Sequence, residues 1–343
     1  MNVEPVVNQR AGNSAQSWLV FRAARLMLRP LLTYWPLTRW GLLPLPLVDS
    51  VAGLLPPPRG VRFERVGFTG FHAEWVWAEG VVRPDETDNP GSGGAVLYFH
   101  GGAFLACGLA THRREVARIS AACGLPVLSV GYRQLPTVGL AGSLQDCRAV
   151  YDWLLEQGLD PARIVFAGDS AGGYLAFATA LAARDAGLVL PGGIVALSPW
   201  LDLDATAKQA HPNAALDAYA PASRLPTLAA LLAGLDADPG LSPVNQDLTG
   251  LPPVLIMAAE HEMLRCDAEL MTERLATAGV PCALQIWAGQ VHAFPVLGNL
   301  LPESRAAIEE IGAFVRRIVT PRTRTGPTDA DPTDPEDWSV LAG

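Results

Sequence analysis

Short apolar runs alternate with longer amphipathic stretches along most of this chain. Apolar runs bounded by glycine, proline or polar residues predict buried strands. These runs lie at residues 61–67, 73–79, 95–99, 126–132, 163–167, 193–198, 253–259 and 283–287. Helical patterns lie near residues 111–122, 143–157, 171–185, 266–278 and 302–318. Strands that alternate with helices are typical of an α/β fold, in which helices cover both faces of a mostly parallel central sheet.

The first two predicted strands have no helix between them, and a turn is expected near Gly67 to Gly70. We therefore expect these strands to form an antiparallel edge of the sheet. In an open α/β sheet, functional loops gather at the carboxyl ends of the strands. The loops that follow residues 167, 259 and 287 should therefore meet at one pocket.

Length and composition indicate a globular protein with a substantial core. The chain has 343 residues, 50% of them hydrophobic, which suits one large domain with a helical cap. We assign residues 59–319 to this domain, with a cap insertion at about 204–247 that includes a helix at Leu225 to Leu235. Residues 1–58 are expected to form an N-terminal cap segment. Residues 320–343 are dense in Pro, Thr and Asp, which predicts a disordered acidic tail.

Charge and cysteine usage narrow the class of function. The formal net charge of -9 disfavours nucleic-acid binding, which needs a basic surface. Five cysteines, at 107, 123, 147, 266 and 282, show no C-x-x-C pairing, so reduced thiols and a cytoplasmic location are expected. The sequence has no H-E-x-x-H motif, histidine cluster, Walker loop or dinucleotide fingerprint. We therefore expect neither a metal nor a cofactor.

Ser170 has the sequence context of a nucleophile. It lies in Gly168-Asp169-Ser170-Ala171-Gly172-Gly173, directly after an apolar run and directly before a helical stretch. A serine hydroxyl is a weak nucleophile, so it needs a tight turn where a histidine reaches its proton and backbone amides face the developing oxyanion. Because glycine is common in this chain, the pattern alone could also be an ordinary glycine-rich turn.

A second glycine turn lies upstream. The apolar run 95–99 ends in His100-Gly101-Gly102-Ala103, and such a turn exposes backbone amides. In a serine hydrolase these amides complete the oxyanion hole, each donor contributing about 3 kcal/mol to transition-state stabilisation. We interpret His100 as a structural residue that braces this loop.

His292 follows the predicted strand 283–287 and the turn at Gly289. A single histidine in a loop is more often incidental than catalytic. Its position after the serine and after an acidic region, however, is the chain order of the α/β-hydrolase triad.

These motifs together resemble the hormone-sensitive-lipase branch of the α/β-hydrolases over roughly residues 90 to 318. The resemblance also includes Gly131-Tyr132-Arg133 and Ser198-Pro199-Trp200-Leu201-Asp202-Leu203. It implies the α/β-hydrolase fold with a helical cap and a carboxylesterase of short- to medium-chain acyl esters. It also implies Ser170 as nucleophile, His292 as base, and the amides of Gly102, Ala103 and Ala171 as oxyanion donors, with Gly101 in the same turn. Ala103 replaces the third glycine usual in that branch.

The acid of the triad is where the sequence departs from that branch. A direct alignment puts His261 at the acid's position, between Glu260 and Glu262. Either glutamate could support His292, and we favour Glu262. Adjacent side chains on an extended loop point to opposite sides, so Glu260 and Glu262 are expected to share a side. Asp267 is interpreted as a charge that stabilises the first turn of the following helix.

The N-terminal segment has a basic, amphipathic character. Arg22, Arg25 and Arg29 recur at helical spacing beside Trp18, Phe21, Leu26 and Met27. Such a helix can contact an anionic membrane surface, here through residues 14–40, or form a cap helix with a solvated arginine face. Charged residues and prolines interrupt the segment, so it is not expected to span a bilayer, and it lacks the pattern of a cleaved signal.

Three functions remain for the structure to test. The leading one is a serine carboxylesterase that acts on a small-molecule ester through an acyl-enzyme. The alternatives are a ligand-binding pseudo-hydrolase with an impaired triad, motivated by His261, and a membrane-surface lipase. The sequence allows either a monomer or a homodimer.

Overall fold

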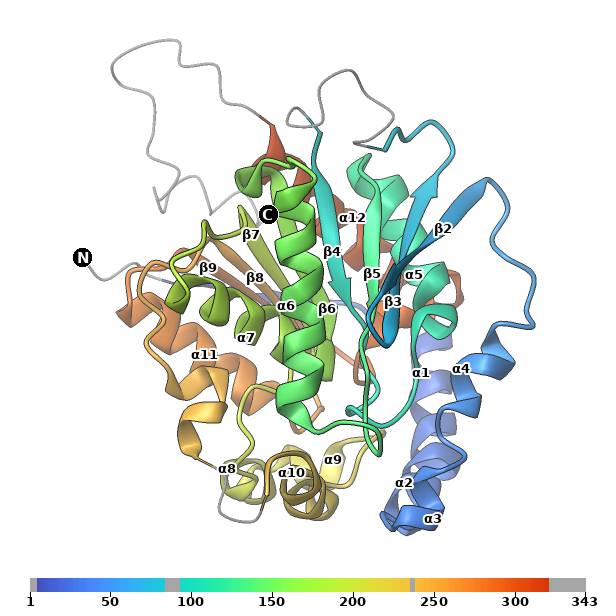
Figure 1. Cartoon of the computed structure of the whole chain (residues 1–343). Coiled ribbons are helices and arrows are strands. Elements are labelled where there is room, and N and C mark those ends of the chain that lie inside the picture. Colours follow the sequence, from blue (N-terminus) through green and yellow to red (C-terminus); the bar gives the residue numbers. More distant parts are fainter. Residues whose placement is uncertain (1–4, 84–92, 235–237, 321–343) are drawn as a thin grey trace.

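The computed structural model describes residues 5–83, 93–234 and 238–320, and its centre is one nine-stranded sheet (Figure 1). The strand order is β1-β9-β8-β7-β6-β4-β5-β3-β2. All the predicted strands are present, with ends that differ by at most two residues. The strands are β1 (Val6–Arg10), β2 (Val61–Phe68), β3 (Phe71–Ala78), β4 (Ala95–Phe99), β5 (Val127–Gly131), β6 (Ile164–Asp169), β7 (Gly193–Leu197), β8 (Val254–Ala259) and β9 (Cys282–Trp287).

The sheet is parallel except at β3. This strand pairs antiparallel with both β2 and β5, whereas every other neighbouring pair is parallel. The predicted antiparallel edge is therefore confirmed. Gly70, with φ of 84°, lies in the turn between β2 and β3, where its lack of a side chain permits the left-handed backbone.

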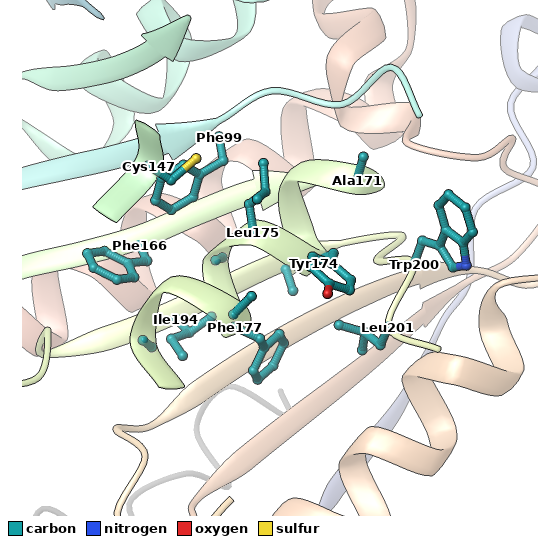
Figure 2. Packing of buried hydrophobic residues seen from close by; sticks show 14 of the residues in the cluster. Phe99, Cys147, Phe166, Ala171, Tyr174, Leu175, Phe177, Ile194, Trp200 and Leu201 are labelled. Carbon is teal, nitrogen blue, oxygen red and sulfur yellow. The ribbon is translucent and has the colours of Figure 1, made fainter. Parts of the chain in front are cut away.

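The strands are apolar at nearly every position because both faces of the sheet are covered. Along β4, Leu97 and Phe99 belong to one hydrophobic core, and Val96 and Tyr98 belong to the other. Figure 2 shows part of the first core, where Phe99 and Phe166 pack edge to face. The first core includes residues of α6 (Leu140–Glu156), α7 (Ala171–Asp185) and α11 (Arg265–Thr277); the second includes residues of α5 (Leu109–Cys123) and α12 (Pro302–Val319). These are the five predicted helices.

The edge strand β1 was missing from the sequence prediction, which assigned residues 1–58 to a cap. Val6–Arg10 pairs in parallel with β9, so these residues extend the sheet. Three of its five residues, Asn8, Gln9 and Arg10, are polar, and this strand lies at the edge of the sheet. An edge strand needs no continuous apolar run, so the hydrophobic pattern gave no signal.

Two cap segments lie beyond the sheet. The N-terminal one contains α1 (Ala15–Ala23), α2 (Arg29–Tyr34), α3 (Arg39–Leu42) and α4 (Leu47–Ala52), and the insertion between β7 and β8 contains α8 (Thr206–Ala210), α9 (Asn213–Leu216) and α10 (Leu225–Ala233). In Figure 1 both segments lie at the lower end of the molecule. The predicted helix at Leu225 to Leu235 is present as far as Ala233, and Leu235 lies outside the described residues.

The two segments are joined by arginines of the N-terminal one. Arg25 Nη1 donates to the carbonyl of Leu216 at 2.9 Å, and Arg29 Nη2 donates to the carbonyl of Ala214 at 2.9 Å. The expected solvated arginine face is therefore wrong for these two side chains, since they face the insertion. Within the described residues, no helix combines the length and apolar character needed to cross a membrane. The tail predicted at 320–343 lies outside them from residue 321 onward.

Candidate active site

Ser170 lies on a strained turn between β6 and α7. Its backbone has φ of 53° and ψ of -114°, a conformation that costs a non-glycine residue about 1–3 kcal/mol and that recurs at functional sites. Glycines make the turn possible: a Cβ on Gly168 would lie 2.4 Å from the carbonyl oxygen of Gly172, and one on Gly172 would lie 1.8 Å from that of Phe99. The predicted close approach of strand and helix is therefore present.

His292 is joined to Glu262. The ring Nδ1 lies 2.7 Å from Glu262 Oε2, and the side chains are 10% and 1% exposed. This contact fixes Nδ1 as the protonated nitrogen, since a carboxylate only accepts, and leaves Nε2 as the nitrogen that can take a proton. Within the described residues, no hydrogen bond joins the ring to the Ser170 hydroxyl.

Burial and charge act on His292 in opposite directions. Burial lowers its pKa, but the hydrogen bond and charge of Glu262 raise it, with smaller contributions from Asp217 and Asp169. The outcome is a pKa above 6.5. The ring therefore carries a proton more readily than a free imidazole does.

A turn after β8 determines which glutamate reaches His292. The amide of Ala259 donates to Glu262 Oε1 at 2.9 Å, which holds the carboxylate toward the histidine loop. Glu260 instead accepts a hydrogen bond from the amide of Gly289 at 3.3 Å. His261 lies 3.6 Å from Glu260 and packs edge to face against Phe21 of α1. The extended loop on which the expected shared side of Glu260 and Glu262 was based is therefore wrong, because residues 260–261 form a turn.

Residues of the insertion also hold the acid loop. Asn213 Nδ2 donates to the carbonyls of Glu260 and Glu262, both at 2.9 Å. The buried carboxylate of Asp217 accepts from the amide of Met263 at 2.8 Å, and the ring of Tyr219 lies 5.3 Å from that of His292. Sequence reasoning missed these three insertion residues, Asn213, Asp217 and Tyr219, because they lie far from the loop in the sequence and no local pattern indicates the contact.

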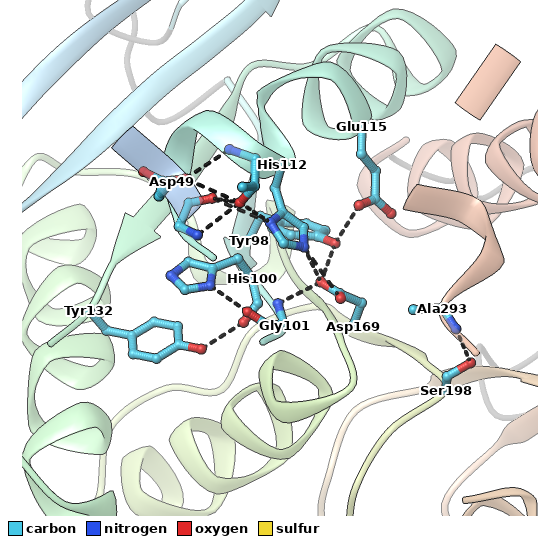
Figure 3. A network of polar contacts seen from close by, with 12 residues as sticks. Asp49, Tyr98, His100, Gly101, His112, Glu115, Tyr132, Asp169, Ser198 and Ala293 are labelled. Carbon is cyan, nitrogen blue, oxygen red and sulfur yellow. Dashed lines mark hydrogen bonds and ion pairs between the residues drawn. The ribbon is translucent and has the colours of Figure 1, made fainter. Parts of the chain in front are cut away.

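Ser198 holds the backbone of the loop immediately after His292. Its Oγ accepts a hydrogen bond from the amide of Ala293 at 2.9 Å, which ties the histidine loop to the end of β7 (Figure 3). Ala293 has φ of 52°, so the chain reverses immediately after His292.

The glycine turn after β4 presents free amides. Within the described part of the chain, the amides of Gly102, Ala103 and Ala171 have no hydrogen-bond partner. Gly102 has φ of 116°, and a Cβ there would lie 1.9 Å from the carbonyl oxygen of Ala106. Ala103, with φ of 57°, keeps the left-handed backbone despite its side chain.

Gly101 differs from the other members of the predicted oxyanion turn. Its amide donates to Asp169 Oδ1 at 2.8 Å, so it is not free to bind an oxyanion. The buried His100 braces the same turn, as expected: its Nδ1 lies 2.7 Å from the carbonyl of Gly101, and its ring stacks on Tyr132 with centroids 4.3 Å apart.

Asp267 has a different role from the one predicted. It does lie in the first turn of α11, but its buried carboxylate pairs with the buried Lys208 at 2.7 Å. It also accepts hydrogen bonds from the amides of Leu201 and Asp202, at 2.9 and 3.0 Å. The carboxylate therefore connects α11 to the insertion and to the segment after β7, rather than acting mainly on its own helix.

The described residues contain one group of side chains with the atom types of a metal site. Ligand atoms of His112, Glu115 and Asp169 lie within 4.8 Å of one another. Asp169 Oδ1 already accepts hydrogen bonds from Tyr98 and Gly101, and Tyr98 also contacts Glu115. Hydrogen bonds through Tyr98 therefore join the Asp169 and Glu115 carboxyl groups. All five cysteines are free.

Ser170 and His292 follow β6 and β9 at the carboxyl edge of a mostly parallel sheet, and this arrangement is that of an α/β hydrolase. A family model described as "alpha/beta hydrolase fold" matches residues 96–296. The chain belongs to this family, in its hormone-sensitive-lipase-like branch.

Relatives and solved structures agree with this assignment. "Esterase LipU" of Mycobacterium tuberculosis is 40% identical over 290 residues, which are 82% of this chain and 93% of that protein. "Carboxylesterase/phospholipase LipF" of the same species is 37% identical over 322 residues, 91% of this chain and 84% of that protein. The crystal structure of an esterase from the bacterial hormone-sensitive lipase family is 33% identical with a TM-score of 0.77, and covers 90% of this chain and 100% of that one.

Proposed function

We propose that the chain is a serine carboxylesterase in which Ser170, His292 and Glu262 form the catalytic triad. The observation that carries the assignment of the acid is the 2.7 Å contact between His292 Nδ1 and Glu262 Oε2. A carboxylate in this position holds the imidazole in one tautomer and stabilises its cation during the reaction. Glu262 thereby supplies the charge that His261 cannot.

The reaction follows from these roles. Ser170 Oγ attacks the ester carbonyl while Nε2 of His292 takes its proton. The amides of Gly102, Ala103 and Ala171 donate to the oxyanion that develops, whereas the Gly101 amide stays with Asp169. Protonated His292 gives its proton to the departing alcohol. Water, activated by the same ring, then hydrolyses the acyl-enzyme and releases the acid.

The substrate is a small-molecule acyl ester, with a short or medium acyl chain. Relatives named as esterases support this class. An "Acetyl-hydrolase" of Streptomyces hygroscopicus is 38% identical over 246 residues, 71% of this chain and 79% of that protein, and its name supports the short end of the range. Five free cysteines support a cytoplasmic location, since thiols persist in reducing compartments.

Two neighbouring glutamates provide a matched test. Glu262→Gln and Glu260→Gln make the same chemical change two residues apart, but only Glu262 contacts His292. We expect Glu262→Gln to lower kcat on p-nitrophenyl butyrate by about four orders of magnitude. Glu260→Gln should lower it by less than about threefold, because the Glu260 carboxylate contacts the Gly289 amide and the partly exposed His261 but not His292. His261→Asp should give no gain, since the acid is already present.

A fluorophosphonate probe tests the nucleophile directly. It should label the chain and fail to label Ser170→Ala. A folded chain that neither reacts with the probe nor hydrolyses esters would overturn the proposed activity. It would also favour the pseudo-hydrolase alternative, whose original motivation, His261, is weakened by the contact of Glu262.

We further propose that residues 14–40 contact an anionic membrane surface. This range holds four arginines and no acidic residue, and Arg22 and Arg39 are exposed. Basic residues beside exposed Trp, Tyr and long apolar side chains suit an interface with anionic lipids. The large exposed apolar side chains of the range are Trp18, Leu19, Leu26, Met27, Leu31, Tyr34 and Trp40.

Point changes test this contact. Removing residues 1–45 would also delete β1 from the sheet, so we suggest the triple variant Trp18→Gln, Met27→Gln and Trp40→Gln. Val189→Gln, at another exposed apolar position, is the matched control. The parent and the control should sediment with phosphatidylglycerol vesicles and the triple variant should not. Equal sedimentation of all three, or a self-association of the parent that the triple change abolishes without vesicles, would overturn the lipid proposal.

A further inference from the structure

A buried polar cluster lies behind the nucleophile turn. It consists of Tyr98 on β4, His112 and Glu115 on α5, and Asp169 at the end of β6 (Figure 3). Each of these residues is at most 4% exposed. The triad does not use any of them, and Asp169 is the residue immediately before Ser170.

Proton counting assigns a charge state to the cluster. The Tyr98 hydroxyl lies 2.8 Å from Asp169 Oδ1 and 3.0 Å from Glu115 Oε2, but it carries only one hydrogen. If both carboxyl groups were ionised, one of these contacts would join two acceptors. A proton on one carboxyl group removes the conflict, because that group then donates to the Tyr98 oxygen.

Asp169 is the ionised member of the pair. Its Oδ1 accepts from the Gly101 amide at 2.8 Å, and His112 Nε2 lies 3.3 Å from the same atom. Burial raises the pKa of Asp169, but the charge of His112 and the hydrogen bonds from His112 and Tyr98 lower it by more, so the pKa lies below its usual value. Glu115 Oε1, by contrast, has no hydrogen-bond partner among the described residues. The proton therefore belongs on Glu115.

Glu115 is thus connected to the oxyanion turn through three successive hydrogen bonds. Its proton is donated to the Tyr98 oxygen, the Tyr98 hydrogen to Asp169, and Asp169 accepts the Gly101 amide. Asp169 also packs directly on this turn, since a Cβ on Gly101 would lie 2.1 Å from its Oδ2. Loss of the proton would leave two buried carboxylates competing for one phenol hydrogen.

We propose that Glu115 is a positioning residue whose protonated form holds Asp169, and through it the oxyanion turn, in the active arrangement. This inference rests on the proposed esterase function. It predicts that the rate falls at alkaline pH when Glu115 ionises, in addition to the acid limb set by His292.

The groups around Glu115 place this ionisation near neutral to alkaline pH. Burial and the charge of Asp169 raise the pKa of Glu115 to about 8, while His112, the Tyr98 hydrogen bond and Arg118 oppose the rise. Other charged groups on the elements packed against α5 have partners or lie at the surface. Glu74 of β3 pairs with Arg113, Asp49 of α4 accepts from Thr111, and Arg305 and Glu309 of α12 line a shallow surface cavity with Arg118.

Glu115→Gln and Glu115→Leu distinguish the effect of losing the hydrogen-bond donor from the effect of losing the ionisable group. Glutamine keeps a donor for the Tyr98 oxygen and cannot ionise, whereas leucine removes the donor. We expect Glu115→Leu to lower kcat at neutral pH by about tenfold with little change in KM, a fraction of the loss caused by removing one oxyanion donor. Glu115→Gln should restore most of that loss and shift the alkaline limb of kcat upward by at least about one pH unit. Glu309→Gln, an exposed change on α12, is the control.

Infrared spectroscopy provides a readout that needs no substrate. The parent should show the carbonyl stretch of a buried carboxylic acid at neutral pH, which disappears at alkaline pH and is absent from Glu115→Gln. An identical spectrum or an identical alkaline limb in the parent and Glu115→Gln would overturn the proposal. Failure of the esterase proposal would appear differently, as no ester hydrolysis by any variant with the infrared band still present.

Discussion

Replacing Glu115 by glutamine is expected to change the pH dependence of folding stability. The pKa of this buried group is raised from 4.5 to about 8, so folding takes up a proton between these two values. A group whose pKa is raised in the folded state contributes most to stability below its unfolded pKa, and the contribution is lost as pH rises to the folded pKa. Glutamine takes up no proton, so the variant lacks this loss.

The magnitude follows from the number of protons. One proton taken up on folding changes the free energy of unfolding by about 1.4 kcal/mol per pH unit. From about pH 5 to about pH 6.5, the parent should therefore lose about 2 kcal/mol relative to Glu115→Gln. Burial lowers the pKa of His112, but Asp169 raises it to about 9, so folding takes up that proton only above 6.5. Burial also raises the pKa of Asp217 and Asp267, but both groups are common to the parent and the variant, so the difference between the two chains below pH 6.5 reports on Glu115.

Urea unfolding at the two pH values measures this difference. The nine tryptophans of the chain provide the fluorescence signal. Glu309→Gln serves as the control, because Glu309 is exposed and should leave the pH dependence of the parent unchanged. If the difference in unfolding free energy between the parent and Glu115→Gln is the same at both pH values, Glu115 is ionised in the folded chain and the proton assignment is wrong.

Three further predictions concern the catalytic loops. Burial lowers the pKa of His292, but Glu262 raises it above 6.5, so kcat/KM should rise with pH through an apparent pKa above 6.5; a limb below 6.5 would contradict this. Gly102→Ala should lower kcat at least about tenfold, since the new Cβ meets a carbonyl and displaces an oxyanion amide. Gly80→Ala is the control, because Gly80 also has a positive φ but a Cβ there meets no atom; it should leave kcat unchanged, and equal losses of kcat in the two variants would refute the reasoning. Ser198→Ala should lower kcat about tenfold at constant KM by freeing the amide after His292; an unchanged kcat would count against that role.

The sequence predicted features that rest on local chemistry. Buried strands must be apolar on both sides, so the strands with two covered faces were recognisable as apolar runs. The serine turn was recognisable because only glycine fits at positions such as 168 and 172. The edge strand β1 carries no such constraint, since no strand of the described residues pairs with its outer edge.

The acid of the triad could not be read from the sequence alone. Glu260 and Glu262 have the same side chain, and the choice between them depends on the turn that brings the Ala259 amide to Glu262. The hydrogen bond from the Gly101 amide to Asp169 likewise depends on the pairing of β4 with β6, which brings together residues far apart in the chain. These features belong to the tertiary structure, and no local pattern contains them.

The insertion connects the loop of the proposed catalytic carboxylate to the N-terminal segment. Asn213 and Asp217 hold the loop that carries Glu262, and Arg25 and Arg29 hold the carbonyls beside them. The segment that presents the exposed apolar side chains therefore also supports the geometry of His292. An N-terminal deletion that includes it would remove β1, these arginine contacts and the proposed lipid surface together, so lost activity would not identify which one mattered. Only changes at exposed positions such as Met27 separate lipid contact from catalysis.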